Sequence, residues 1–195
     1  MSNLFRGRHP TRPMEDRYRG KDLFNDGISR WDVSNVTDMS FMFGAAQSFN
    51  QAIGDWNVSN VTVMREMFSN AHAFNQAIGD WDVSKVTDMY GMFFKAESFN
   101  QAIGLWVVSN VTDMEQMFAG ATAFNQNIRN WNVSNVTNNM KMFLEADAMQ
   151  PDNRPLINRM GGSKQTRRIK RQSKRKHSRK QKQTKKRGVR KTRRG

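Results

Sequence analysis

The stretch FNQAIGDWNVSNVTVMREMFSNAHA, residues 49–73, has close copies on both sides of it. The copies follow one another with a fixed period of 25 residues, and five of them fill residues 24–148. A fixed period of this size is typical of stacked repeats, in which one copy cannot bury its apolar face alone. The period is kept by Trp31, Trp56, Trp81, Trp106 and Trp131, by Phe49, Phe74, Phe99 and Phe124, by Ile28, Ile53, Ile78, Ile103 and Ile128, and by Val36, Val61, Val86, Val111 and Val136.

We expect each copy to hold two short strands and a short helix. In the copy at 49–73, residues 52–56 form the first strand, which is favoured by stacking, and residues 61–64 form the second, which begins with a β-branched Val-Thr pair. Met67, Phe68, Ala71 and Phe74 recur at three- and four-residue spacing, which suits one or two helical turns. The predicted fold class is an α/β repeat solenoid of five coils.

Stacking places each residue beside its counterpart in the next coil, at about 4.8 Å if the coils pair as parallel strands. The five Trp residues could stack on a carbohydrate or a base, but their recurrence beside Ile and Val registers favours a core. An asparagine directly follows each recurring Phe, and its side-chain amide can satisfy backbone groups at the turn. We therefore expect an internal asparagine ladder, formed by Asn50, Asn75, Asn100 and Asn125.

The flanking segments differ from the repeat. Residues 1–23 contain six basic residues and two prolines, and we expect them to cap the first coil. Residues 149–160 contain Pro151 and Pro155 and predict a C-terminal cap, onto which Leu156, Ile157 and Met160 fold back. Residues 161–195 begin with Gly-Gly-Ser and predict a disordered basic tail.

Charge is divided unevenly along the chain. Of its 32 Lys and Arg residues, 18 lie between Ser163 and the C-terminus, where there is no acid, so the remainder carries 14 basic against 17 acidic residues. The absence of cysteine excludes disulfides, thiolate metal sites and lipid-acceptor cysteines. No signal peptide and no transmembrane stretch is recognisable. We expect an intracellular protein.

Several recurring polar residues have two readings. Asp38, Asp88 and Asp113, with Asp32 and Asp82, could offer oxygen ligands to a hard cation, but a solvated acidic stripe fits better because Val63 and Asn138 interrupt it. Four Asn-Val-Thr triplets match the N-glycosylation pattern, and without an export signal we read them as structural turns. These triplets begin at Asn35, Asn60, Asn110 and Asn135.

Catalytic chemistry is not indicated. His9, His72 and His177 stand in unrelated contexts, and no Ser/His/Asp grouping, phosphate-binding glycine loop or metal-ligand spacing is present. We therefore expect no enzyme activity, no cofactor and no metal.

The tail offers dense positive charge, which neutralises phosphates without needing a folded shape. It predicts binding to nucleic acid or another polyanion, and the same runs resemble a nuclear-localisation signal or an attachment to an acidic surface. The predicted contact residues are Lys174, Arg175, Lys176, Arg179, Lys180, Lys185, Lys186, Arg187, Arg190, Lys191, Arg193 and Arg194.

The motif WDVSNVTDM at residues 31–39, with FNQAIGDWDVSKVTDMYGMF at 74–93, resembles the BspA-like leucine-rich repeat family of the DUF285 type. The resemblance covers all five copies and implies a right-handed, leucine-rich-repeat-like solenoid for protein contact, without known catalysis. Members are similar to surface or adhesion proteins of bacteria and mycoplasmas, and occur in protists and large DNA viruses. Lys85, Asn139 and Met149 depart from the repeat pattern.

Two functional hypotheses follow. The first is a non-enzymatic scaffold that contacts a protein through its coils, with a tail for nucleic-acid binding or for nuclear or virion targeting. The alternative is a surface adhesion protein of the BspA-like type, whose tail binds an anionic surface. The sequence identifies neither the protein partner nor the oligomeric state.

Overall fold

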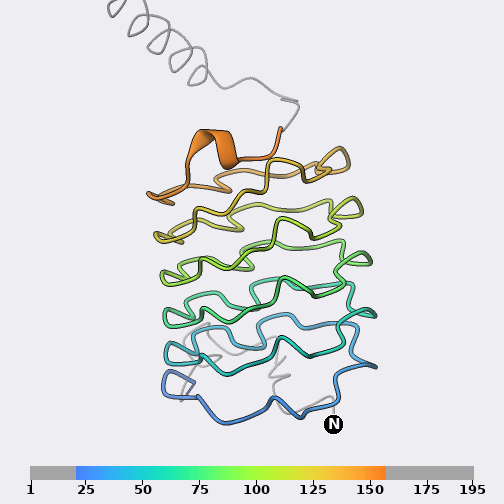
Figure 1. Ribbon diagram of the computed structural model, residues 1–195, viewed down its shortest axis with the longest axis vertical. Helices are drawn as coiled ribbons and strands as arrows, with labels where there is room; N and C mark the ends of the chain where they lie inside the picture. The colour runs from blue at the N-terminus through green and yellow to red at the C-terminus, as the bar shows by residue number, and fades with distance from the viewer. Residues whose placement is uncertain (1–20, 157–195) are drawn as a thin grey trace, which may run out of the picture. The chain divides into compact units, whose positions relative to one another are not determined.

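The computed structural model describes residues 21–156. The chain divides into two units, Met1–Ile157 and Asn158–Gly195, and the predicted basic tail falls outside the described residues together with most of the N-terminal segment. Within the first unit the 25-residue coils lie one upon another in chain order, as the colours from blue to orange in Figure 1 show. The repeat register is therefore kept in space.

The predicted α/β secondary structure is wrong. The described residues contain one helix, the 3-10 helix η2 (Pro151–Asn153), and it lies after the last copy of the repeat. Instead of strands, the coils are joined by a series of isolated parallel bridges: Asp38 to Val63, Val63 to Asp88, Asp88 to Asp113, and Asp113 to Asn138. The coils themselves consist of turns and extended single residues (Figure 1).

The expected helix does not form because two residues in every coil have left-handed backbone conformations. In the second coil these are Glu66, with φ of 50°, and Asn70, with φ of 58°. An α-helix needs negative φ throughout, so a positive φ at every fourth residue prevents it. The same two positions are left-handed in all five coils: Phe41, Glu66, Gly91, Gln116 and Lys141, and Ala45, Asn70, Lys95, Gly120 and Glu145.

The resulting backbone alternates between two kinds of hydrogen bond. The N–H groups of Met64, Glu66, Phe68 and Asn70 donate to carbonyls of the next coil at 2.7–2.9 Å. Between them, the N–H groups of Met67 and Ser69 donate three residues back within the same coil, Met67 to the Met64 carbonyl at 3.3 Å. Every coil from the first to the fourth repeats this arrangement. The segment therefore pairs most of its backbone N–H groups, although it is neither a helix nor a strand.

Each inter-coil bond in this segment belongs to a column of peptide groups. The N–H of Met39 donates to the carbonyl of Val63, which belongs to the same peptide group as the N–H of Met64. The N–H of Met64 donates to the carbonyl of Asp88, and the N–H of Met89 donates in turn to the carbonyl of Asp113. Because the accepting carbonyl and the next donating N–H share one peptide plane, the column is continuous from coil to coil. Four such columns run side by side through the stack, starting at the N–H groups of Met39, Phe41, Phe43 and Ala45.

The expected strands are absent for a related reason. At 52–56 the N–H of Trp56 donates to the carbonyl of Ile53, 3.2 Å away in the same coil, and not to a neighbouring coil. Near Val61, the N–H of Thr62 reaches the carbonyl of Thr37 at 2.8 Å, but pairing stops at the single bridge that follows. Stacking therefore keeps the register without producing ladders long enough to be strands.

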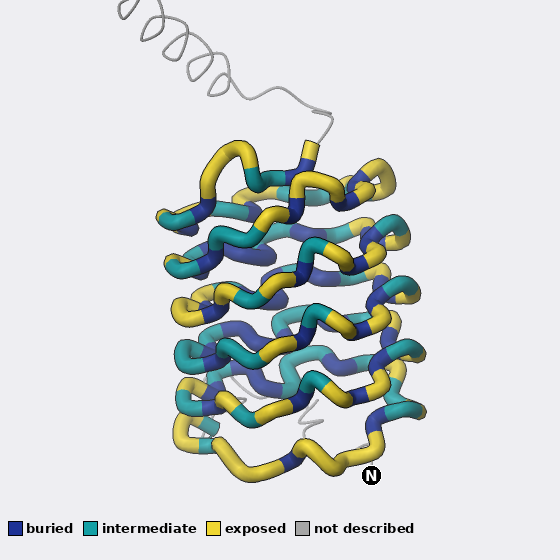
Figure 2. Tube along the Cα trace, viewed as in Figure 1, coloured by how far each residue is buried: buried dark blue, intermediate teal, exposed yellow. Residues whose placement is uncertain are grey.

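The core lies inside the coils and is built from the predicted ladders. Phe rings of adjacent coils stack at 5.5–5.9 Å between centroids, as for Phe68 and Phe93. Two Phe columns interlock, with Phe68 and Phe74 only 3.9 Å apart. Figure 2 shows buried residues recurring along the inner side of successive coils. The described body therefore has one continuous apolar spine.

The tryptophans from the second coil on belong to this core, as predicted. Trp81 is 4 % exposed, and its Nε1 donates to the carbonyl of Ile53 in the preceding coil at 3.1 Å. Trp56, Trp106 and Trp131 make the same bond to the equivalent carbonyl. Trp31, in the first coil, is 39 % exposed and departs from the expectation.

The asparagine ladder is present, but it lies toward the surface and is not internal. The side-chain oxygen of Asn50 accepts the backbone N–H of Asn75 at 2.9 Å, and Gln76 Nε2 donates to the same oxygen at 3.0 Å. The bond from backbone N–H to asparagine oxygen runs from Asn25 through Asn125 to Gln150. Each amide joins two coils at a place where the backbones make no direct bond.

Close packing of coils also explains a recurring glycine. A Cβ added to Gly79 would stand 2.4 Å from the carbonyl oxygen of Ala102 in the next coil, and Gly54 and Gly104 meet the same obstacle at 2.5 Å. The last coil carries Arg129 in this register, where no further complete coil follows. The neighbouring backbone thus accounts for glycine in the second, third and fourth coils, whereas the first coil carries Ser29 in this register.

The C-terminal end of the stack is partly covered. Met149 takes the place of the next Phe and is buried, and the N–H of Ile128 donates to the carbonyl of Asn153 in η2. The Arg154 guanidinium lies 4.9 Å from the centre of the Phe143 ring, and burial lowers its pKa. Leu156, which we expected to fold back, is exposed, and Ile157 and Met160 lie outside the described residues.

Candidate protein-interaction surface

One arc of each coil changes its outward side chains from copy to copy, while its inward residues stay constant apart from Asn139 in the fifth coil. We call it the variable arc; in the second coil it spans residues 63–72. Met64, Met67, Phe68 and Ala71 point into the core and are fully buried. The position after the first Met carries a different residue in every coil: Ser40, Arg65, Tyr90, Glu115 and Met140.

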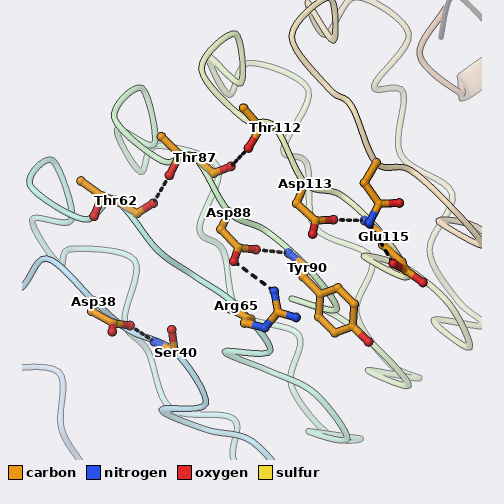
Figure 3. A network of polar contacts seen from close by, with 11 residues as sticks. Asp38, Ser40, Thr62, Arg65, Thr87, Asp88, Tyr90, Thr112, Asp113 and Glu115 are labelled. Carbon is orange, nitrogen blue, oxygen red and sulfur yellow. Dashed lines mark hydrogen bonds and ion pairs between the residues drawn. The ribbon is translucent and has the colours of Figure 1, made fainter. Parts of the chain in front are cut away.

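Asx turns shape the start of this arc. The side-chain oxygen of Asp88 accepts the backbone N–H of Tyr90, two residues on, at 2.8 Å (Figure 3). Asp38 and Asp113 accept the N–H groups of Ser40 and Glu115 in the same way. A short side chain that binds its own backbone two residues later favours such turns. The carboxylates therefore fix the backbone that presents the variable side chains.

Two neighbouring coils share a polar and aromatic cluster at the centre of the arc. Arg65 Nη1 lies 3.1 Å from Asp88 Oδ2, and its guanidinium carbon stands 3.9 Å from the centroid of the Tyr90 ring. Figure 3 shows Arg65 reaching across toward both residues. Partial burial, followed by the nearby carboxylates of Glu66 and Glu115, raises the pKa of the Tyr90 phenol. The cluster holds a cation and an aromatic ring in fixed positions on the surface.

The same two registers are also joined between the fourth and fifth coils. There Asn138 Nδ2 donates to Glu115 Oε2 at 2.8 Å, with donor and acceptor exchanged relative to Arg65 and Asp88 two coil interfaces earlier. Asp88 and Asp113 are bridge partners, so the predicted adjacency of these acids is confirmed. Their carboxylates are used in turns and in the bond to Arg65. No group of three His, Cys, Asp or Glu residues among the described positions is arranged to hold a metal ion.

A threonine ladder borders the arc. The hydroxyl of Thr87 donates to the carbonyl of Thr62 at 3.2 Å, and Thr112 donates to Thr87 at 3.1 Å (Figure 3). Beside it, the amide nitrogens of Asn60, Asn110 and Asn135 donate to serine carbonyls of the preceding coil at 2.8–2.9 Å. Lys85 stands in this register in the third coil and donates to Asn60 Oδ1 at 2.8 Å. The Asn-Val-Thr triplets thus connect coils.

The twelve predicted tail residues, from Lys174 to Arg194, lie outside the described residues, as do His9 and His177. Sequence reasoning also missed two exposed apolar residues, Leu105 and Val107, which flank Trp106. Comparison of the copies would have found them, since the other coils carry polar residues at both positions.

Comparison with known proteins identifies the family. The model of a family described as "Mycoplasma protein of unknown function, DUF285" matches residues 10–89 and 75–160. No curated protein and no solved structure matches the chain. None of the helices found at the described positions has the length and apolar character to cross a membrane. The family matches overlap and together extend over most of the chain, including all five copies, so the chain belongs to the DUF285 family.

Proposed function

We propose that this chain is a non-enzymatic scaffold, which binds a protein through the variable arc and a polyanion through its basic tail. Nucleic acid is the polyanion that the tail suits best, and the tail can equally direct the chain to a nucleus or a virion. The variable arc carries the first part of the proposal, because its outward side chains differ from coil to coil on a framework that is largely constant.

A constant framework with a varied surface is how repeat proteins build binding faces. The inward residues around Arg65 and Tyr90 repeat in the other coils, except that Asn139 replaces the first Met in the fifth, and the asparagine and threonine ladders also repeat. Selection for folding alone accounts for those constant residues. The differing outward residues therefore carry whatever distinguishes this protein's partner.

The chemistry at the centre of the arc suits a binding hot spot. Tyr and Arg are enriched among residues that dominate interface energies, because they combine a large contact area with hydrogen bonding. Asp88 holds Arg65 through its second oxygen while its first fixes the Tyr90 backbone. Such pre-organisation lowers the entropy that a partner would have to overcome.

Site-specific photo-crosslinking tests this surface. A photoreactive phenylalanine analogue is placed at position 90 of the full chain, and in a control at position 110, an exposed framework position. We expect discrete protein adducts in cells from position 90 and none from position 110. Arg65→Ala should weaken the position-90 adducts. Equal adducts from both positions would contradict a specific role for the arc.

The tail part of the proposal rests on its 18 basic residues without an acid. Charge of this density binds phosphates mainly by counterion release, so affinity depends on salt and little on sequence. With about six charges engaged on duplex DNA, log K should fall with log salt at a slope of about −5.

Fluorescence anisotropy with duplexes of unrelated sequence measures that slope. Truncation after Met160 should abolish binding and leave the thermal unfolding of the coils nearly unchanged. Tight binding by the truncated chain, or an affinity that salt does not change, would show that the tail is not the polyanion site.

A further inference from the structure

A second surface of the stack carries side chains that the folding of the coils does not explain. On either side of each of the five Trp residues lies one exposed residue; we call these ten residues the outer strip. They are Arg30, Asp32, Asp55, Asn57, Asp80, Asp82, Leu105, Val107, Asn130 and Asn132, and all are exposed. The fourth coil alone places apolar residues in the strip.

Leu105 and Val107 do not enter the core, because successive side chains of this segment alternate between the inner and the outer side. Trp106 and Val108 are buried, while Leu105 is 90 % exposed and Val107 is 56 % exposed. Side chains that alternate along an extended segment face opposite sides, so Leu105 and Val107 share the outer side. Single exposed apolar residues are ordinary, but two neighbours on an otherwise polar strip form a patch.

The fourth coil also lacks a turn hydrogen bond that the other four coils form. In the third coil Asp82 accepts the N–H of Ser84 at 3.0 Å, and in the fifth Asn132 accepts that of Ser134 at 3.2 Å. The first and second coils make the same bond through Asp32 and Asn57. Val107 has no oxygen with which to accept the N–H of Ser109. The substitution therefore worsens the turn and exposes apolar surface.

Charge around the patch indicates what it binds. The third coil presents Asp80 and Asp82 in the same two registers, and Asp55 follows in the second coil. The fifth coil presents two neutral amides, Asn130 and Asn132. The Trp106 and Trp131 rings stack 6.3 Å apart, which confirms that equivalent positions of adjacent coils are neighbours. The apolar pair thus has an acidic border on one side and a neutral one on the other.

We propose that Leu105 and Val107 form the anchor of a docking site for a protein segment that carries an apolar side chain beside Lys or Arg. The apolar side chain covers the pair, and the cation lies against Asp80 and Asp82. This inference rests on the proposed scaffold function and gives it a second contact surface, distinct from the variable arc.

Binding of short fluorescent peptides to the full chain tests the site. The probes are a peptide of alternating Lys and Leu, one of Lys and Ser with equal charge, and one of Leu and Ser without charge. Two double variants are compared: Leu105→Asp with Val107→Asn, which restores polar residues to both registers, and Asp80→Asn with Asp82→Asn, which keeps the turn acceptor. Urea unfolding confirms that both remain folded.

The Lys-Leu peptide should bind the unaltered chain at least tenfold more tightly than either other peptide. Each double variant should lose at least tenfold in that affinity. Unchanged affinity in the Leu105/Val107 variant would overturn this inference, as would equal binding of the Lys-Ser peptide. If the affinity is instead lost in Tyr90→Ala, the scaffold proposal stands and the outer-strip site fails. Self-association that the Leu105/Val107 variant abolishes would show that a second copy occupies the patch, and would overturn the stated partner.

Discussion

Substitution of Gly79 by alanine tests the close approach of adjacent coils. The added Cβ would stand 2.4 Å from the Ala102 carbonyl oxygen, nearly 1 Å inside an ordinary contact, and the obstacle is backbone that cannot rotate away. The two coils must therefore separate or tilt. Overpacking of this kind costs about 1–3 kcal/mol, and the lower entropy of the unfolded alanine chain offsets about 0.4–1 kcal/mol. Because the obstacle is backbone, the overpacking cost should lie at the upper end of its range, about 3 kcal/mol, so we expect a net loss of about 2 kcal/mol in the free energy of unfolding.

Gly27→Ala is the matched control, because no described atom lies within 4 Å of its added Cβ. The same entropy term should leave this variant unchanged or stabilise it by up to about 1 kcal/mol. Urea denaturation followed by tryptophan fluorescence measures both, and thermal unfolding should show Gly79→Ala about 4–8 °C lower than the unaltered chain. Equal stability of the two variants would refute the required contact between residues 79 and 102.

Three further changes address the core, a turn and the backbone. Trp81→Ala should lower the free energy of unfolding, measured in urea, by about 3–5 kcal/mol, because this Trp is buried. Trp31→Ala removes an exposed Trp and should lower it far less. Similar losses in the two variants would contradict the difference in burial. Hydrogen bonds from the Ser84 side chain and backbone lower the pKa of Asp82 in the folded chain. The ionised carboxylate therefore stabilises the fold above about pH 4, and this stabilisation is lost as pH falls through the pKa of Asp82 in the folded chain. Asp82→Asn should flatten the acid limb of a stability-against-pH curve, and an unchanged limb would contradict this. At Lys95, where φ is 54°, Gly should be more stable than Ala by about 1 kcal/mol in thermal unfolding, and the reverse order would exclude backbone strain there.

The sequence predicted the register and the core because both depend on spacing alone. Phe74 and Trp106 had to meet their counterparts once the period was recognised, and they do, at Phe99 and Trp131. The sequence did not reveal the backbone, because left-handed conformations at Glu66 and Lys95 carry no compositional mark. Gly91, Gly120 and Asn70, which occupy those two registers, are residue types that tolerate positive φ and were the indication available. Apolar spacing of three and four residues therefore indicated which residues are buried and misled about the helix.

The candidate surfaces were predictable to a smaller extent. Charge density marked the tail, but its residues lie outside the described part of the chain. The pairing of Arg65 with Asp88 depends on a separation of 23 residues, which only the stacking geometry brings to 3.1 Å. Leu105 and Val107 stand out when the copies are aligned, yet their exposure follows from the in-and-out alternation around Trp106. Comparison between copies is thus informative mainly once the orientation of each register is known.

The peptide columns give the stack an electrical direction. Each peptide group in the four columns accepts from the coil before it and donates to the coil after it, so the peptide dipoles add along the stack, as they do in an α-helix. The last donors, the N–H groups of Asn139, Lys141, Phe143 and Glu145, have no acceptor within residues 21–156, and they give that end a partial positive charge. The carboxylates of Glu145 and Asp147 in the last coil suit such an end. Lengthening the array by one whole copy would strengthen this dipole and move its positive pole one coil further along, in a fold whose coils contain no helix.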